Sequence, residues 1–207
     1  MLKKALSAVA LVCLCAPFAA AQEDVGHFDV SFSWGAVFNK VSSSASNGVT
    51  VSPTNSGLIL GTFRVRFNRM SGVEVNGARS DNSQIFILGT TEYRAQTSIT
   101  EFSGAYVLSP FHFEKIEPFL LAGGGALRFY PSNQYINGNP SPFSAAQQTS
   151  MAFLYGAGVD YRAWKRLGLR LQYRGLIYKE PTFHVTQFFT GTKGHMAEPS
   201  IGIVLNF

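Results

Sequence analysis

The chain has 207 residues, with 17 Lys and Arg against 12 Asp and Glu, so its formal charge is +5. Charged residues make up only 14% of the sequence, well below the roughly 25% of soluble domains, while aromatic residues also reach 14% and there are 20 glycines. The length indicates one domain, and the modest charge argues against nucleic-acid binding. The composition instead suits a β-barrel whose strands alternate apolar and polar residues.

The N-terminal end has the features of a secretory signal peptide. Lys3 and Lys4 precede a short apolar run, and small residues after it predict cleavage before Gln22. The apolar run is too short for a membrane-anchoring helix, which needs about 20 residues. We therefore predict a signal peptide at 1–21 and one mature domain at 22–207.

Both cysteines, Cys13 and Cys15, lie inside the predicted signal peptide. The mature chain therefore offers no thiol for a disulfide, a metal site or nucleophilic catalysis. A lipoprotein needs Gly or Ala immediately before the modified cysteine, but Val12 and Leu14 stand there, which argues against lipidation. No later stretch reaches about 18 consecutive apolar residues, so we expect no transmembrane helix.

From residue 28 the sequence alternates with the two-residue period of a β-strand. In the first segment the apolar residues share one face, while Asp29, Ser31 and Ser33 share the other. A segment of about ten residues is long enough to cross an outer membrane at a tilt. Similar segments follow, and the sequence predicts strands at 28–38, 58–67, 73 onwards, 98–108, 118–130, 151–161, 167–177 and 195–207.

The connections between these predicted strands alternate between long and short. The second long connection is the least defined, because residues 85–88 form an apolar run that either extends the third strand or belongs to the loop. Transmembrane barrels have this asymmetry, with short periplasmic turns and longer external loops. We place short turns at 68–71, 110–116 and 164–166, and the other long loops at 39–56, 131–149 and 180–194.

The fifth predicted strand contains three consecutive glycines at 123–125. Glycines also occur in phosphate-binding loops, but such a loop must be followed by the N-terminus of a helix. The residues that follow read ALRFY, which is typical of a strand, so we interpret the glycines as a site of curvature or close packing. We assign Phe119, Leu121, Leu127 and Phe129 to the apolar face of this strand.

The segment PSIGIVLNF at 199–207 carries the most specific pattern. Ile201, Ile203, Leu205 and Phe207 fall on one face, and small or polar residues fall mostly on the other. This ending resembles the C-terminal strand of bacterial outer-membrane barrels. In those proteins, alternating apolar residues and a terminal Phe form the signal read by the barrel-assembly machinery.

With the signal peptide and strands such as FLLAGGGALRFY and LYGAGVDYRAW, the mature chain resembles small outer-membrane barrels of the OmpA transmembrane-domain and OmpX type. The resemblance implies an all-β fold, namely an eight-stranded antiparallel up-and-down transmembrane β-barrel with short periplasmic turns and long external loops. It also implies location in the bacterial outer membrane, with both termini in the periplasm.

In such a barrel the outer face must be apolar, with aromatic residues near the two membrane interfaces. We expect these interface residues to include Trp34, Phe38, Phe67, Tyr106, Phe129, Tyr161, Tyr173 and Phe207. The charged residues opposite the apolar stripes should then form a paired network in the lumen, since buried charges require partners. This predicted network is Arg64, Arg66, Glu74, Glu101, Arg128, Asp160, Arg162, Arg170, Arg174 and Glu198. The alternative is a soluble lipocalin-like barrel, in which the same charges would face water around an apolar ligand cavity.

We expect no catalytic, cofactor-binding or metal-binding site. The four histidines are too scattered for metal ligation, and His195 lacks the His-x-Ser-Asn pattern associated with lipid A deacylases. We predict a monomer with a structural or surface-interaction role. Its expected partners are outer-membrane lipid, including lipopolysaccharide, and the assembly machinery, but no nucleic acid. A lipid A-modifying enzyme and a small pore for ions or solutes stay open as alternatives.

Overall fold

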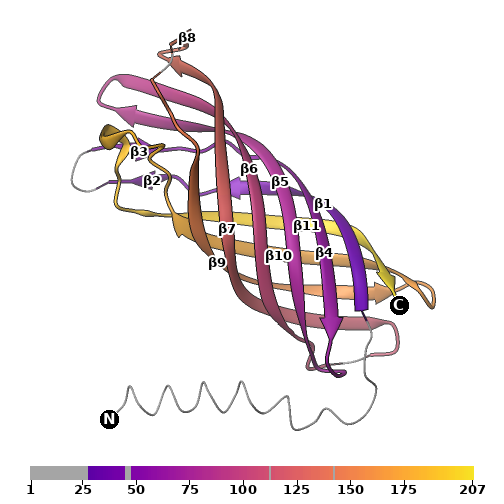
Figure 1. The fold of residues 1–207 in the computed structure, drawn as a ribbon. Helices are drawn as coiled ribbons and strands as arrows, with labels where there is room; N and C mark the ends of the chain where they lie inside the picture. Colours follow the sequence, from indigo (N-terminus) through magenta and orange to yellow (C-terminus); the bar gives the residue numbers. More distant parts are fainter. Residues whose placement is uncertain (1–27, 45–47, 112, 142) are drawn as a thin grey trace, which may run out of the picture.

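A computed structural model describes residues 28–44, 48–111, 113–141 and 143–207, which form one all-β domain (Figure 1). The predicted signal peptide lies outside the described residues. Within the described part of the chain, no helix is long and apolar enough to cross a membrane.

Eight long strands build the barrel and three short ones decorate its external loops. The long strands are β1 (Phe28–Asn39), β4 (Ser56–Arg66), β5 (Ser71–Leu88), β6 (Thr91–Leu108), β7 (Ile116–Ile136), β9 (Gln148–Arg162), β10 (Leu167–Lys179) and β11 (Lys193–Asn206). The short elements are β2 (Ser42–Ser43), β3 (Thr50–Val51), β8 (Asn139–Pro140) and the 3₁₀ turn η2 (Thr186–Phe188).

The sheet closes because the first and last long strands pair with each other. Each long strand is antiparallel to its neighbours, and on β1 the residue Phe32 lies between Gly61 of β4 and Ile203 of β11. The remaining long strands follow in chain order, so the topology is up-and-down. Closure removes the two free edges that an open sheet would present to lipid. The predicted eight-stranded barrel is confirmed.

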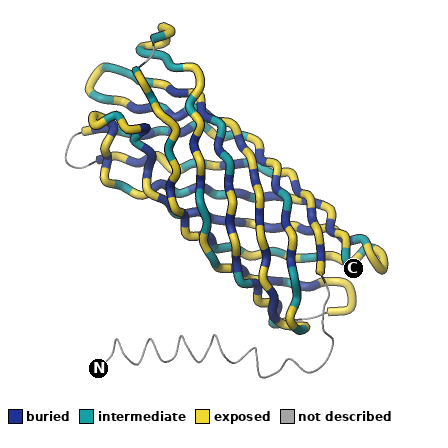
Figure 2. Tube along the Cα trace, viewed as in Figure 1, coloured by how far each residue is buried: buried dark blue, intermediate teal, exposed yellow. Residues whose placement is uncertain are grey.

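Burial alternates along the strands (Figure 2), and the large apolar side chains gather on the outside. On β10, Leu171 is 62% exposed whereas its neighbour Arg170 is fully buried. A soluble barrel would place these two residues the other way round, because water solvates charge and excludes hydrocarbon. The lipocalin-like alternative is therefore wrong.

The fifth transmembrane strand, β7, departs from the prediction. Phe119, Leu121, Leu127 and Phe129 face the interior rather than lipid, so Phe129 is not an interface residue. The outward positions are filled by small residues in the middle of the strand and by Ile116, Leu120, Arg128 and Tyr130. Both faces of this strand are apolar, so alternation alone did not identify which one meets the membrane.

The second external connection also differs from the predicted long loop. β5 and β6 both continue for 18 residues and are joined by Gly89 and Thr90 alone. Gly89 has a φ of 60°, in the left-handed region that tight hairpin turns require. The hairpin projects from the external end of the barrel in Figure 1, beyond the barrel wall, and there its strands no longer need an apolar face.

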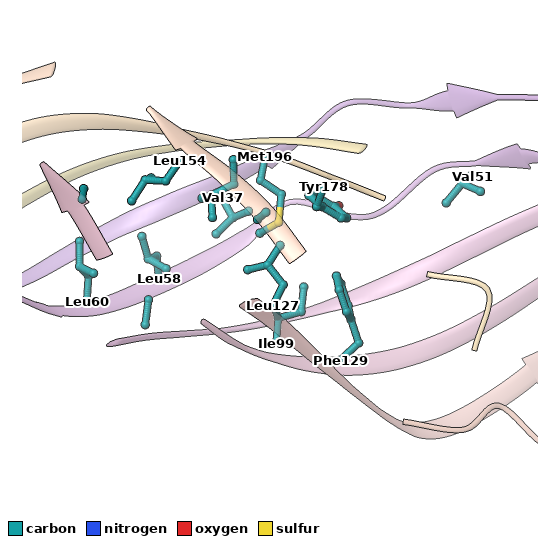
Figure 3. Close-up of a cluster of buried hydrophobic side chains, with 14 of the residues drawn as sticks. Val37, Val51, Leu58, Leu60, Ile99, Leu127, Phe129, Leu154, Tyr178 and Met196 are labelled. Carbon is teal, nitrogen blue, oxygen red and sulfur yellow. The ribbon is translucent and has the colours of Figure 1, made fainter. Parts of the chain in front are cut away.

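The external half of the interior is an apolar core (Figure 3). Its side chains come from all eight long strands, so the two sides of the barrel meet across the lumen. The core includes Val37, Leu58, Leu60, Ala78, Ile99, Leu127, Phe129, Leu154, Leu176 and Met196. An eight-stranded barrel is narrow enough for side chains to fill it.

Leu171 lies near the middle of the apolar belt on β10, whereas Leu167 lies at the periplasmic edge of the same strand. We predict that Leu171→Arg lowers the free energy of unfolding by about 2–4 kcal/mol, because a lipid-facing charge costs most at the bilayer midplane. The control Leu167→Arg should cost at most about 1 kcal/mol. Chemical unfolding in phospholipid vesicles measures both values, and equal losses would contradict this position of the belt.

Candidate functional site

The periplasmic half of the interior holds an ion network centred on Asp160. Arg170 donates to this carboxylate from Nε at 2.7 Å, and Arg64 donates from Nη1 at 3.2 Å. Arg64 also pairs with Glu74 at 2.9 Å, while Arg170 pairs with Asp29 at 3.1 Å. These five residues come from β9, β10, β4, β5 and β1, so the network ties together strands on all sides of the lumen.

Two further residues extend this network toward the periplasmic opening. Arg66 pairs with Glu117 and lies 3.6 Å from Asp29 and 3.7 Å from Asp160. Phe119 lies at the periplasmic end of the apolar core, and its ring centroid is 4.2 Å from the Arg64 guanidinium carbon. A cation over an aromatic face is attracted by the ring quadrupole, so Phe119 links the charged half of the lumen to the apolar half.

A second ion cluster lies deeper in the barrel. Arg174 pairs through Nη2 with Glu101 on β6 and with Glu198 on β11, the latter at 2.9 Å. Ser103 donates a hydrogen bond of 2.5 Å to Glu101. All three charged side chains are buried. One guanidinium therefore serves two carboxylates, and it bridges opposite walls of the barrel.

The predicted lumen residues separate into three groups. Eight of them, Arg64, Arg66, Glu74, Glu101, Asp160, Arg170, Arg174 and Glu198, lie in the two clusters. Arg162 is exposed and lines the periplasmic mouth. Arg128 is a correction, because it is exposed on the outer surface of β7, where its guanidinium carbon lies 5.0 Å from the Tyr130 ring. This error has the same cause as the wrong assignment of Phe129, because the inner and outer faces of β7 were exchanged in the prediction.

The prediction missed Asp29 and Glu117, which both join the network. Asp29 was recognisable, since it stands on the polar face of the first predicted strand. Glu117 lies immediately before Pro118, where we expected the fifth strand to begin. Its inward position can be predicted only if the alternation of β7 is assigned with the correct face toward the lumen.

The periplasmic opening widens into a hollow of about 530 Å³. Arg66, Glu117 and Asp160 form its inner wall, while Arg69 and Arg162 stand at its rim. The ion pairs of the inner wall separate this hollow from the apolar core above. Among the described residues, the hollow therefore ends at the ion pairs of its inner wall.

The last external loop, residues 180–192, covers the other end of the barrel. Phe188 stacks on Phe86 with ring centroids 4.3 Å apart, and Phe183 meets the same ring edge-on at 5.9 Å. Gln148 Oε1 accepts hydrogen bonds from the backbone N–H of Thr182 and Phe183, at 2.9 and 2.7 Å. We call this loop the cap, because its two buried aromatic rings close the apolar core from above.

Glu180, the first residue of the cap, is a buried carboxyl at 2% exposure. Ser42 of β2 donates to its Oε1 at 3.1 Å, and Tyr178, Lys179 and Lys193 are its neighbours on β10 and β11. Burial raises the pKa of Glu180 to about 7, and the hydrogen bond from Ser42 only partly opposes this shift. The cap therefore contains a group that titrates near neutral pH.

The residues of the predicted assembly signal lie on the outer face of β11. Ile201, Ile203 and Leu205 are exposed, and the ring of Phe207 stacks on Phe28 with centroids 4.9 Å apart. The Phe207 N–H also donates to the Phe28 carbonyl at 3.0 Å. This contact completes the seam between the first and last strands, while recognition by the assembly machinery stays a prediction.

His195, the residue considered for catalysis, lies on the outer face of β11. Its Nε2 is 2.8 Å from the Tyr155 hydroxyl of β9, which reaches across β10 over Gly175. Serine-histidine catalysis needs a nucleophilic hydroxyl beside the imidazole and a third group that orients it. In the described part of the chain the imidazole of His195 contacts a tyrosine hydroxyl, so this pair does not form that arrangement.

The family model described as outer membrane protein beta-barrel domain matches residues 6–201 of the chain. No curated protein sequence matches this chain. Solved structures with similar folds include OprG from Pseudomonas aeruginosa, with 14% identity and a TM-score of 0.65 over 88% of this chain and 96% of that one. Neisserial surface protein A has 16% identity and a TM-score of 0.55 over 89% and 100% of the two chains.

A third similar structure is Ail, the attachment invasion locus protein of Yersinia pestis, in complex with the heparin analogue sucrose octasulfate. It has 14% identity and a TM-score of 0.51, covering 89% of this chain and 100% of that one. At these low sequence identities, the similarity of the three structures to this chain shows a shared fold alone.

We predict that Arg174→Met lowers the free energy of unfolding by about 3–5 kcal/mol, because it leaves two carboxylates buried without their counter-charge. Adding Glu101→Gln and Glu198→Gln should recover much of the loss. The control is Arg162→Met at the exposed mouth, which should change stability by less than about 0.5 kcal/mol. Urea unfolding in vesicles measures all four proteins, and a similar loss at Arg162 and Arg174 would contradict the role of the buried cluster.

The Glu180 carboxyl has a raised pKa in the folded barrel, so the stability it contributes is present at low pH and is lost as pH rises through about 7. We predict that the wild-type protein is less stable at pH 8 than at pH 5, by at most about 3 kcal/mol. Glu180→Gln should reduce this difference, whereas Glu92→Gln, at a half-exposed carboxylate on β6, should leave it unchanged. Unfolding titrations at the two pH values measure it, and an unchanged pH dependence in Glu180→Gln would reject the assignment.

Proposed function

The chain belongs to the outer membrane protein beta-barrel domain family, and on this basis we propose that it is a non-catalytic barrel that interacts with partners at the cell surface. It lies in the bacterial outer membrane. Residues 1–21 serve as its export signal and 22–207 as its mature domain, which acts as a monomer after insertion by the barrel-assembly machinery.

The filled interior is the observation that supports this proposal. Ion clusters around Arg170 and Arg174 occupy the periplasmic half of the lumen, the apolar core occupies the external half, and the cap covers its end. In the described part of the chain these side chains obstruct the lumen, which argues against the pore alternative. Catalysis is disfavoured because His195 contacts a tyrosine hydroxyl rather than a serine.

The external surface supports an interaction role through its charge and shape. The β5–β6 hairpin extends past the barrel wall, and exposed cations outnumber exposed carboxylates in the external half of the described chain. The cations are Lys40, Arg79, Arg94, Arg128, Lys179 and Lys193, and the carboxylates are Asp81 and the half-exposed Glu92. Ail, which shares the fold, was solved with a heparin analogue. We propose that polyanions at surfaces, and the anionic lipid of the outer leaflet, are the partners that this chain contacts.

We predict that the purified protein gives no single-channel steps in planar bilayers, because its lumen is filled. Stable conductance steps would support the pore alternative instead.

The surface role is tested with cells that express the protein, by their adherence to immobilised heparin. We predict that Arg79→Gln/Arg94→Gln, with Arg79 on the outer face of β5 and Arg94 on the projecting hairpin, lowers adherence several-fold. The matched control Lys165→Gln/Arg166→Gln removes the same charge from the periplasmic turn and should have no effect. If wild-type cells adhere no better than cells without the protein, the polyanion-binding role is rejected.

A further inference from the structure

Two lysines on the external rim of the barrel are placed directly opposite each other. Lys179 of β10 and Lys193 of β11 are paired in the antiparallel register, and both are exposed. Directly opposed residues of two strands have Cβ atoms about 5 Å apart, and like charges in such a pair repel. The pair therefore carries an electrostatic cost that the barrel itself does not relieve.

A third cation completes a cluster at this place. The backbone N–H of Lys40, which follows β1, donates to the His195 carbonyl of β11 at 3.0 Å. Lys40 therefore lies one strand away from Lys193 and is also exposed. The Nζ atom of Lys179 lies 5.6 Å from the ring centroid of Phe189 in the cap, which favours a position of its ammonium group close to the rim.

The lysine cluster lies at the upper edge of the lipid-facing belt. The outward positions next below it toward the membrane are Ile177 on β10, Phe38 on β1 and His195 on β11. The carboxylate nearest in sequence, Glu180, is buried on the inner side and accepts a hydrogen bond from Ser42. Within the described external half, the exposed carboxylates lie on β5 and β6, which do not adjoin β1, β10 or β11.

We propose that Lys40, Lys179 and Lys193 form a docking site for the phosphorylated headgroup of a glycolipid in the outer leaflet. Their ammonium groups would meet phosphate at headgroup depth, while Ile177 and Phe38 meet the acyl chains below. The phosphate offsets the repulsion between Lys179 and Lys193, which accounts for a like-charged pair at this level. This inference rests on the proposed contact with outer-leaflet lipid and assigns it to one sector of the barrel.

The test measures binding of diphosphorylated lipid A to the purified protein in uncharged detergent, by native mass spectrometry. Lys179→Gln/Lys193→Gln should weaken binding about thirtyfold, while Lys179→Arg/Lys193→Arg should retain it. The control Lys165→Gln/Arg166→Gln removes two cations at the periplasmic end and should bind like wild type. Dephosphorylated lipid A should bind the wild type and the Gln variant equally weakly.

Thermal unfolding gives a second readout that does not depend on the binding assay. Without lipid A, Lys179→Gln/Lys193→Gln should be at least as stable as wild type, because the repulsion is removed. With lipid A, the order should reverse, because only wild type gains stability from the ligand.

Equal lipid A affinity in wild type and the Gln variant would overturn the proposal. So would an equal loss of affinity in the periplasmic control, or displacement of lipid A by inorganic phosphate at a similar concentration, which would indicate a site for free anions. None of these outcomes depends on heparin adherence or on conductance, so this inference and the proposed surface role can fail separately.

Discussion

The absence of hydrogen-bond partners in the bilayer is the constraint on which the rest of this structure depends. Every backbone N–H and C=O within the membrane must pair inside the protein, so the sheet has to close on itself. The pairing of β1 with β11 satisfies that demand, and the Phe28–Phe207 stack lies where this seam reaches the periplasm. Closure then determines the two faces, because one side of each strand must contact lipid and the other must fill a narrow lumen.

The lumen is filled by two different kinds of packing. In its periplasmic half, each buried arginine meets at least one carboxylate, as Arg170 does with Asp160 and Asp29. In its external half, apolar side chains from opposite walls meet directly, and the cap adds Phe183 and Phe188. The two halves constrain the sequence differently. Ion pairs require particular partners and so fix the register of neighbouring strands, whereas the apolar core requires only side chains whose total volume fills the lumen.

Alternation in the sequence predicted the strand number and the facing of seven strands, and the resemblance to small outer-membrane barrels implied the closed barrel. It failed for β7, where both faces are apolar and the inward Leu127 and Phe129 look like lipid-facing residues. Arg128 was predicted to lie in the lumen for the same reason, because the two faces of β7 were exchanged. The long β5–β6 hairpin was also missed, because strands outside the membrane need no apolar face. Which carboxylate pairs with which arginine depends on contacts between strands far apart in sequence, and no local pattern contains that information.

The distribution of charge explains why the net charge of the chain is a poor guide to its partners. The described interior contains four arginines, Arg64, Arg66, Arg170 and Arg174, against seven carboxyls including Glu180, so burial takes up most of the acidic residues. The exposed charges of the described chain are then mostly cations, and the lipid-facing belt confines them to the two membrane rims. A sequence with a formal charge of only +5 therefore presents strongly basic rims. Because phosphate-bearing headgroups lie at that depth in the bilayer, the closed barrel sorts its own charges toward the anionic part of the membrane.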